Sequence, residues 1–366
     1  MVMQARVRIV MARWSAPARG HVRAARCLAA LLATGLLSGC GTGYLLQAAR
    51  GQWQVMHGRE PLATVIARPQ TDTALRARLE EVAAARDFAS RELGLPDNAS
   101  YRTFRALGRP YVVWNVVATP EFSVEPRQWC FPFAGCLAYR GYFSEAAARA
   151  YAARLRARGD DVVVGGVSAY STLGHFADPL LDTMLRTGET DLIGTLFHEL
   201  AHQRVYARGD SAFNESFAMA VEYEGLRRWF AARGGEAGLA QLRERRRTER
   251  ALQDVLLRGR ERLRALYAQP LPTAELRARK GGILQQTAAE LLSYESAHHL
   301  RSGYDEWVRD GLNNAQLASV GTYHDCVAAF ESLLAVDGGE LRALYADARA
   351  LARGPAATRR HLCAGP

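Results

Sequence analysis

Apolar positions recur at helical spacing along most of this chain and alternate as in strands in parts of its first half. Residues 189–205 place leucine, isoleucine, phenylalanine and valine three and four positions apart, which predicts a helix. A segment rich in breaker and capping residues, 207–211, follows it, and a second helical pattern runs from 213 past 222. We therefore expect two consecutive helices joined by a reversal of the chain.

The remaining pattern predicts an α+β protein, with a small mixed sheet followed by helices and a mainly helical C-terminal region. Helices are predicted at 44–57, 71–93, 144–158, 224–233, 239–267, 273–299 with an interruption at Gly281-Gly282, and 326–334. Strands are predicted at 101–107, 111–118, 138–143 and 161–172. We interpret the many arginines of 239–267 as a solvated face, the alternative being a basic surface for anionic lipid or cell-wall polymers. The expected divisions are an N-terminal helical segment at 40–98, a core at 99–230 and a helical region at 231–366.

Residues 198–202 read His-Glu-Leu-Ala-His, an H-E-x-x-H motif within the first of the two consecutive helices. Residues four apart share a helix face, with Cβ atoms about 5–6 Å apart, so His198 and His202 can bind one metal ion. Glu199 projects about 100° around the helix from His198, which suits contact with a water molecule rather than with the metal. This arrangement is typical of a hydrolytic Zn²⁺ site.

A zinc site of this type takes three protein ligands and leaves a fourth position open. Glu215 follows His202 by thirteen residues, and the reversal at 207–211 can return it to the histidines. Glu222 lies two further helical turns along the same face, seven residues beyond Glu215. Glu222 either orients a ligand histidine from behind or is itself the third ligand, and both interpretations stay open here.

The motif helix followed by Asn-Glu-Ser-Phe-Ala at 214–218 resembles the gluzincin metallopeptidases, the group that contains thermolysin and the membrane-alanyl-type aminopeptidases. Residues 213–218 are especially similar to the L-N-E-G-F-A segment of the latter. The gap between the second histidine and Glu215 is shorter than in those families, and their amine-binding G-x-M-E-N stretch is absent. Together with its lipoprotein-like start, the chain more closely resembles a family of bacterial lipoproteins catalogued as aminopeptidases.

This resemblance implies a zincin-like fold with His198, His202 and Glu215 as zinc ligands. It implies Glu199 as the base of peptide-bond hydrolysis and, by role rather than by motif, Tyr323 or His324 as the group that stabilises the oxyanion. It also implies that an edge strand binds the substrate backbone, and residues 168–174 are our candidate for lining that cleft. We expect an aminopeptidase; the alternatives are a zinc endopeptidase and a non-catalytic envelope binding or assembly lipoprotein with a structural zinc.

Residues 1–39 have the layout of a lipoprotein signal peptide. Six arginines precede the apolar run 27–37, which is too short to span a bilayer. Residues 37–40, Leu-Ser-Gly-Cys, resemble a bacterial lipobox, so we expect Cys40 to carry the lipid that anchors the protein in the cell envelope. The alternative is an ordinary secretory signal. No aspartate follows Cys40, which in a Gram-negative cell favours the periplasmic face of the outer membrane.

Composition and net charge argue against nucleic acid as a binding partner. The chain has 366 residues, 49% of them hydrophobic, which is enough to bury a substantial core. Its formal charge of +10 falls to +4 once the six arginines of the leader are removed. Because no recognition motif accompanies this charge, we expect peptides rather than nucleic acid as partners.

The cysteine count indicates an oxidising compartment. Outside the leader and the lipobox, four cysteines remain, an even number. Cys130 and Cys136 enclose a proline and a glycine, so a local disulfide is our first expectation. A bond between Cys326 and Cys363 is the second.

Overall fold

The computed structural model describes residues 42–131, 135–324 and 326–363. Within these ranges the strands form three small sheets, with the orders β1-β2-β8, β6-β3-β7 and β4-β5. The bounds are β1 Glu60–Pro61, β2 Thr103–Arg105, β3 Val113–Thr119, β4 Trp129–Phe131, β5 Gly135–Leu137, β6 Arg140–Tyr142, β7 Asp161–Val167 and β8 Leu180–Leu181. The predicted leader and Cys40 lie outside the described residues.

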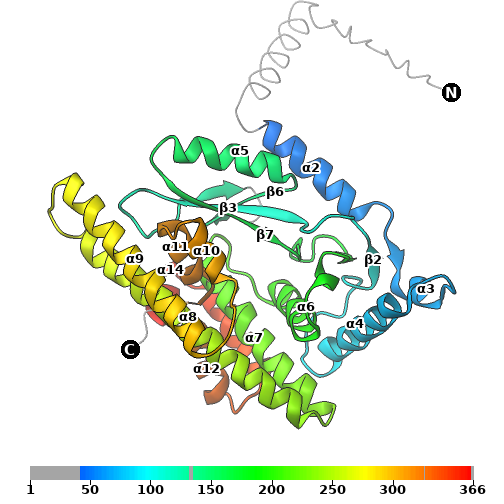
Figure 1. Cartoon of the computed structure of the whole chain (residues 1–366). Helices are drawn as coiled ribbons and strands as arrows, with labels where there is room; N and C mark the ends of the chain where they lie inside the picture. The colour runs from blue at the N-terminus through cyan, green and yellow to red at the C-terminus, as the bar shows by residue number, and fades with distance from the viewer. Residues whose placement is uncertain (1–41, 132–134, 325, 364–366) are drawn as a thin grey trace, which may run out of the picture. The chain divides into compact units, whose positions relative to one another are not determined.

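Strand β3 is the centre of the sheet that matters most for the site (Figure 1). It pairs antiparallel with β6 and, over seven residues, with β7, from Val113 opposite Val167 to Thr119 opposite Asp161. Strand β7 is therefore an edge strand of this sheet. Strand β2 pairs antiparallel with β1 and parallel with β8. The sheets thus contain both kinds of pairing.

Three predicted strands are longer in the sequence pattern than in the structure. The strand predicted at 138–143 covers Arg140–Tyr142. The strand predicted at 161–172 ends at Val167, and farther along the chain Leu173 and Gly174 form a turn with φ of 57° and 81°. The strand predicted at 101–107 covers only Thr103–Arg105, since Tyr101 has a φ of 61° that no strand accommodates.

The N-terminal helices agree with the prediction. They are α2 Thr42–Met56, α4 Thr73–Arg91 and α5 Glu145–Arg156, together with the short α3 Leu62–Ala67, which was not predicted. Asp72 caps α4 by accepting hydrogen bonds from the amides of Ala74 and Leu75, and Ser144 caps α5 through Ala147.

The two central helices are α6, Glu189–Arg204, and α7, Ser211–Ala232, which pack against each other. The predicted pair with its reversal is confirmed, and the separate helix predicted from 224 is the continuation of α7. Asp210 caps α7 through the amide of Phe213, and the Asn214 side chain bonds both the amide and the carbonyl of Ala207. These local bonds hold the reversal in place.

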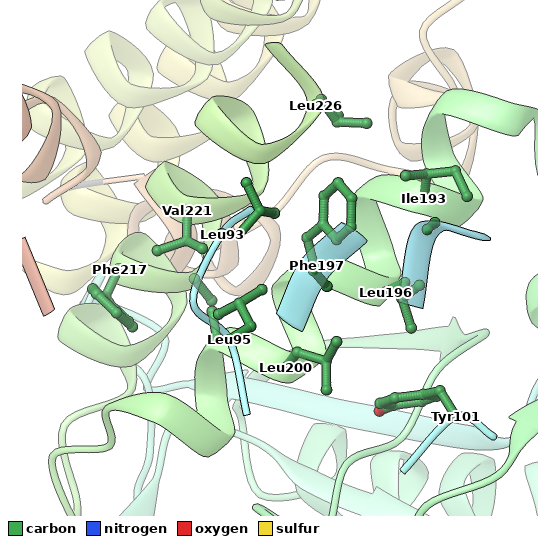
Figure 2. Close-up of a cluster of buried hydrophobic side chains, with 14 of the residues drawn as sticks. Leu93, Leu95, Tyr101, Ile193, Leu196, Phe197, Leu200, Phe217, Val221 and Leu226 are labelled. Atoms are coloured by element: carbon green, nitrogen blue, oxygen red, sulfur yellow. The ribbon is translucent and has the colours of Figure 1, made fainter. Parts of the chain in front are cut away.

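Apolar side chains from both central helices form the main core, shown in Figure 2. Phe197, fully buried on α6, and Leu93 both lie against Gly225 of α7. A Cβ on Gly225 of α7 would lie 2.7 Å from the Phe197 ring and 2.9 Å from Leu93, so only glycine fits there without rearrangement. The close approach of the two helices therefore depends on this residue.

The C-terminal region is helical, as predicted, and this confirms the α+β class. Its helices are α8 Glu236–Tyr267, α9 Thr273–Ala297, α10 Tyr304–Asp310, α11 Asn314–His324, α12 Val327–Val336, α13 Leu341–Arg353 and α14 Ala356–Cys363. Helices α8, α9 and α11 share a second apolar cluster that includes Leu256, Leu291 and Leu317. The predicted interruption at Gly281-Gly282 is wrong, because packing on α8 keeps α9 continuous through the two glycines.

Ion pairs account for several arginines of α8. Arg246 and Arg250 both pair with Glu331 of α12, and Arg245 pairs with Asp191 of α6. These contacts favour the interpretation of this helix as a solvated, internally paired face. Among the described residues, no helix is long and apolar enough to cross a membrane.

Both expected disulfides are present. The Cys130–Cys136 bond links β4 to β5 and closes their hairpin. The Cys326–Cys363 bond ties the segment ahead of α12 to the end of α14. Together with the packing of α12 on α7, the second bond holds the C-terminal helices to the core.

Candidate metal centre

Three potential metal ligands converge between α6 and α7. His198 and His202 lie one turn apart on α6, with their rings at 85° to each other and their Nε2 atoms 3.1 Å apart. Oε2 of Glu215, on α7, lies 3.2 Å from Nε2 of His198 and 3.5 Å from Nε2 of His202. His202 and Glu215 are buried, and the His198 side chain is nearly so.

The donor set fits a tetrahedrally coordinated cation. Ligand atoms about 2.0–2.1 Å from a tetrahedral zinc ion are about 3.3 Å from one another, close to the three separations seen here. With both rings neutral and their Nε2 atoms unprotonated, all three atoms carry lone pairs that a cation at their centre would attract. His198, His202 and Glu215 could therefore hold a metal ion.

Glu222 lies on the other side of the His198 ring. Its Oε2 is 3.1 Å from Nδ1 of His198. With a metal ion at Nε2, the ring would donate its Nδ1 proton to this carboxylate. The position is made possible by Gly194, where a Cβ would lie 2.7 Å from Oε1 of Glu222. Of the two glutamates considered from the sequence, Glu215 is the one that faces both Nε2 atoms.

Burial and neighbouring opposite charges shift the pKa values of His198 and Glu215 in opposite directions. Burial by itself would lower the pKa of His198, but its hydrogen bonds to Glu215 and Glu222 raise that pKa well above its ordinary value. Burial by itself would raise the pKa of Glu215, but His202 and the bonds from both histidines lower it to about 2. Glu215 is thus ionised, which a metal ligand has to be.

Glu199 and Tyr323 lie near the same centre. Burial raises the pKa of Glu199, and the nearby histidines oppose that rise. The charge of Glu215, then burial, then the charge of Glu199 raise the pKa of Tyr323 well above its ordinary value. Ser216 holds the Tyr323 segment in place: its hydroxyl donates to the Tyr323 carbonyl at 3.1 Å and accepts from the Cys326 amide at 3.2 Å.

His324, the other candidate for the oxyanion, has a different environment. Burial alone lowers its pKa to about 4, with no contribution from the charges of the centre. Of the two candidates, Tyr323 is the one whose pKa is raised by the charges of Glu215 and Glu199.

Sequence reasoning missed three further tyrosines around the centre. The pKa of Tyr139 is raised well above its ordinary value by burial and then by Glu215, Tyr323, Tyr206 and Glu199. Burial, then Glu215, raises the pKa of Tyr206 to about 12, and burial, then Glu199, raises that of Tyr101 well above its ordinary value. All three lie in connecting segments of the structure, although the sequence pattern placed Tyr101 and Tyr139 at the starts of predicted strands.

The disulfide hairpin is docked on the reversal between α6 and α7. A Cβ on Gly135 would lie 2.6 Å from the amide nitrogen of Gly209, so the two backbones touch. The Ala138 amide donates to the hydroxyl of Ser211 at 3.4 Å, and Ser211 lies one helical turn before Glu215. The Cys130–Cys136 hairpin is thus part of the wall of the centre.

The segment predicted to line the cleft, 168–174, lies beside the end of α6. Gly174 approaches the side chain of Gln203, and Thr172 is held by Asp178, which accepts both its amide and its hydroxyl at 2.8 Å. Because β7 ends at Val167, the segment is an irregular extension of the edge strand rather than part of it.

Comparison with known proteins gives one match. Neither a curated protein nor a solved structure is significantly similar to this chain. A family model described as "Putative aminopeptidase" matches residues 43–362, which is most of the chain and includes the whole metal centre. The chain belongs to this aminopeptidase family.

Proposed function

We propose that this protein is a zinc aminopeptidase of the bacterial cell envelope with a zincin-like catalytic core. The observation that carries the proposal is the convergence of His198, His202 and Glu215, with Glu199 adjacent to the first histidine. Membership of the aminopeptidase family supports peptides as substrates. A zinc ion in this site would act as a Lewis acid toward the peptide carbonyl and lower the pKa of a water molecule toward neutrality.

Glu199 is the proton carrier in this proposal. Its carboxylate accepts a proton from the attacking water and passes it to the leaving nitrogen. Burial, which raises its pKa, makes it a stronger base than an exposed glutamate and allows it to hold the proton between the two transfers.

Tyr323 is the proposed hydrogen-bond donor to the carbonyl oxygen of the substrate. Its phenol stays protonated at neutral pH, because negative charge and burial both raise its pKa. A neutral phenol near Glu199 and Glu215 can donate a hydrogen bond to the oxygen as negative charge develops on it.

Strand β7 offers the peptide a place to bind. Among the described residues it pairs with β3 and has no strand on its other edge, where an extended peptide could add. Backbone hydrogen bonds at such an edge accept many sequences, which suits an enzyme that trims varied peptides.

The function is tested by incubating a mixed peptide library with wild-type protein and with Glu199→Gln, and reading the products by mass spectrometry. We expect ladders shortened from the N-terminus in the wild type only, and a fall in kcat of about 10²- to 10⁴-fold in the variant. Metal analysis provides the control, because Glu199→Gln should keep its zinc. Internal cleavage would indicate an endopeptidase, and bound zinc without any product would favour the binding lipoprotein.

Anchoring through Cys40 is tested separately. We expect the N-terminal peptide of the mature protein to begin at Cys40 and to carry the mass of a lipid modification. Cys40→Ser should prevent that modification and release the catalytic region from the membrane fraction once the leader is removed. An unmodified N-terminus elsewhere in the chain would contradict the anchor without affecting the peptidase proposal.

A further inference from the structure

Helix α2 carries three of the seven large apolar side chains that are exposed among the described residues. These are Leu45, Leu46 and Trp53, with exposed fractions of 59%, 71% and 61%. The other four are far apart in the sequence: Tyr111, Phe176, Leu292 and Val336. Exposed apolar residues that stand singly are ordinary, whereas a group of them on one short helix indicates an interaction surface.

The exposed side chains of α2 share one side of the helix. With about 100° of rotation per residue, five exposed positions fall within an arc of about 140°, namely Leu45, Leu46, Ala49, Arg50 and Trp53. The opposite side packs inward: Val55 is buried in the main core, and a Cβ on Gly51 would collide with the Phe143 ring. The exposed arc is therefore the side of α2 that is left for a partner.

The polar side chains of α2 are less exposed than its apolar ones. Its three glutamines, Gln47, Gln52 and Gln54, are all half-buried, while both leucines and the tryptophan face solvent. A helix that packs on a core and meets water on its outer side shows the reverse distribution. The outer side of α2 is therefore better suited to an apolar or interfacial medium than to water.

The place of α2 in the chain indicates which medium covers this side. The helix begins at Thr42, two residues after Cys40, so its start lies within about 7 Å of the proposed lipid-bearing residue. Helix α2 contains no acidic residue, and Arg50 is on the exposed arc, which suits the phosphates of lipid headgroups. Tryptophan is a preferred residue at the boundary between lipid and water.

On the basis of the envelope anchor in the proposed function, we propose that the exposed side of α2 lies in the headgroup region of the membrane that the Cys40 lipid enters. Leu45 and Leu46 reach past the headgroups, Trp53 stays at the boundary with water, and Arg50 pairs with lipid phosphate. The acyl chains hold the protein at the membrane, and α2 determines how the first turns of the chain lie on it.

The experiment separates the helix from the lipid. Residues 40–366 carrying Cys40→Ser, and therefore without lipid, are mixed with vesicles and sedimented. A helix side of this size binds reversibly, so such a chain is still released from washed membranes. Vesicles of phosphatidylcholine alone measure the apolar contribution, and vesicles that also contain phosphatidylglycerol measure the contribution of charge.

Two sets of substitutions divide these contributions. We expect Leu45→Gln with Leu46→Gln to weaken binding to both kinds of vesicle roughly tenfold, because burial of two leucine side chains is lost. Arg50→Gln should act mainly on vesicles with phosphatidylglycerol and weaken binding to them roughly fivefold.

Val336→Gln is the matched control. Val336, at the end of α12, is 85% exposed, so this variant removes an exposed apolar side chain at a different place. We expect it to bind vesicles as the parent does. Melting temperature is measured for each variant, so that a folding defect is recognised.

Trp53 supplies a second measurement. Among the described tryptophans it is the exposed one, so lipids brominated on their acyl chains should quench its fluorescence in the parent. We expect that quenching to be lost in Trp53→Phe.

Equal vesicle binding by the parent and the double leucine variant would overturn the proposal, as would equal quenching in Trp53→Phe and the parent. A dimer of the parent that the leucine variant dissociates would assign this side of α2 to a second copy of the chain instead. If the natural protein carries no lipid on Cys40 but the unlipidated chain binds vesicles as expected, the anchor fails and the role of α2 stands. Neither measurement depends on peptide cleavage.

Discussion

Oε2 of Glu222 lies 3.1 Å from Nδ1 of His198, on the side of the ring away from the atoms that face His202 and Glu215. This carboxylate orients the His198 ring from behind, without facing the position that a metal ion would occupy. The two glutamates of α7 thus have different tasks, although they lie two turns apart on one helix.

Zinc affinity should separate these two tasks. Replacing a carboxylate behind a ligand histidine typically weakens metal binding by roughly 10- to 100-fold, and we expect this of Glu222→Gln. Glu215→Ala removes a ligand and should cost more, leaving protein that loses zinc during dialysis. Competition with a chelator, followed by metal analysis, measures both. Retention of zinc by Glu215→Ala with its loss from Glu222→Gln would exchange the two roles.

Tyr323 and His324 are neighbours with different surroundings, which makes them a matched pair. Tyr323→Phe should lower kcat by roughly 10²- to 10³-fold with little change in KM, because a bond to the developing oxyanion is strongest in the transition state. His324→Gln should change kcat only slightly, since the charges of the centre do not influence its ring. Steady-state kinetics on one arylamide substrate decides between them, and a larger loss in His324→Gln would reverse the assignment.

Asp178 should make stability depend on pH in the direction opposite to a carboxylate whose pKa is lowered by folding. Burial raises its pKa from 3.8 to about 6, so the folded state holds this proton more tightly than the unfolded state does. The contribution is present in full below pH 4 and is lost as the pH rises through 6, and its size is about 3 kcal/mol at most. Asp178→Asn cannot titrate and should lack this loss.

Urea unfolding of wild type and Asp178→Asn at pH 4, 5, 6 and 7 measures the effect. The difference between the two unfolding free energies is the useful quantity, because contributions from other titrating groups cancel in it. We expect the variant to gain stability relative to the wild type between pH 4 and pH 6. A constant difference over this range would show that Asp178 does not titrate there.

Two glycines allow a packing test. Gly225→Ala places a methyl group 2.7 Å from Phe197 and 2.9 Å from Leu93, which should destabilise the fold by about 1–3 kcal/mol. Gly282→Ala, in the continuous helix α9, places its methyl group in open space and should stabilise by roughly 0.5–1 kcal/mol. Thermal unfolding measures both, and equal effects would contradict the close approach of α6 and α7.

Local rules in the sequence predict much of the site. His198 and His202 share a helix face because their spacing matches the helical repeat, whatever surrounds them. The reversal is also local, since Asp210 and Asn214 bond backbone groups within seven residues of themselves. For the same reason the hairpin disulfide, closed over six residues, follows from the spacing of its cysteines.

The tertiary structure decides what depends on segments distant in the chain. Tyr139, Tyr206 and Tyr101 are single residues in connecting segments, and only the folded chain brings their phenols toward Glu199 and Glu215. The continuity of α9 also could not be predicted from the sequence. Each of its two adjacent glycines disfavours a helix locally, and the packing of α9 on α8 outweighs that cost.

The sequence by itself thus determined the helix that carries His198 and His202, the reversal after it and the class of the fold, because those follow from periodicity and short-range hydrogen bonds. Only the tertiary structure decided which glutamate faces both histidines, because Glu215 and Glu222 lie on one helix face and are equivalent until a second helix packs against them. It also decided which tyrosines lie near the histidines, because those tyrosines come from segments distant in the chain.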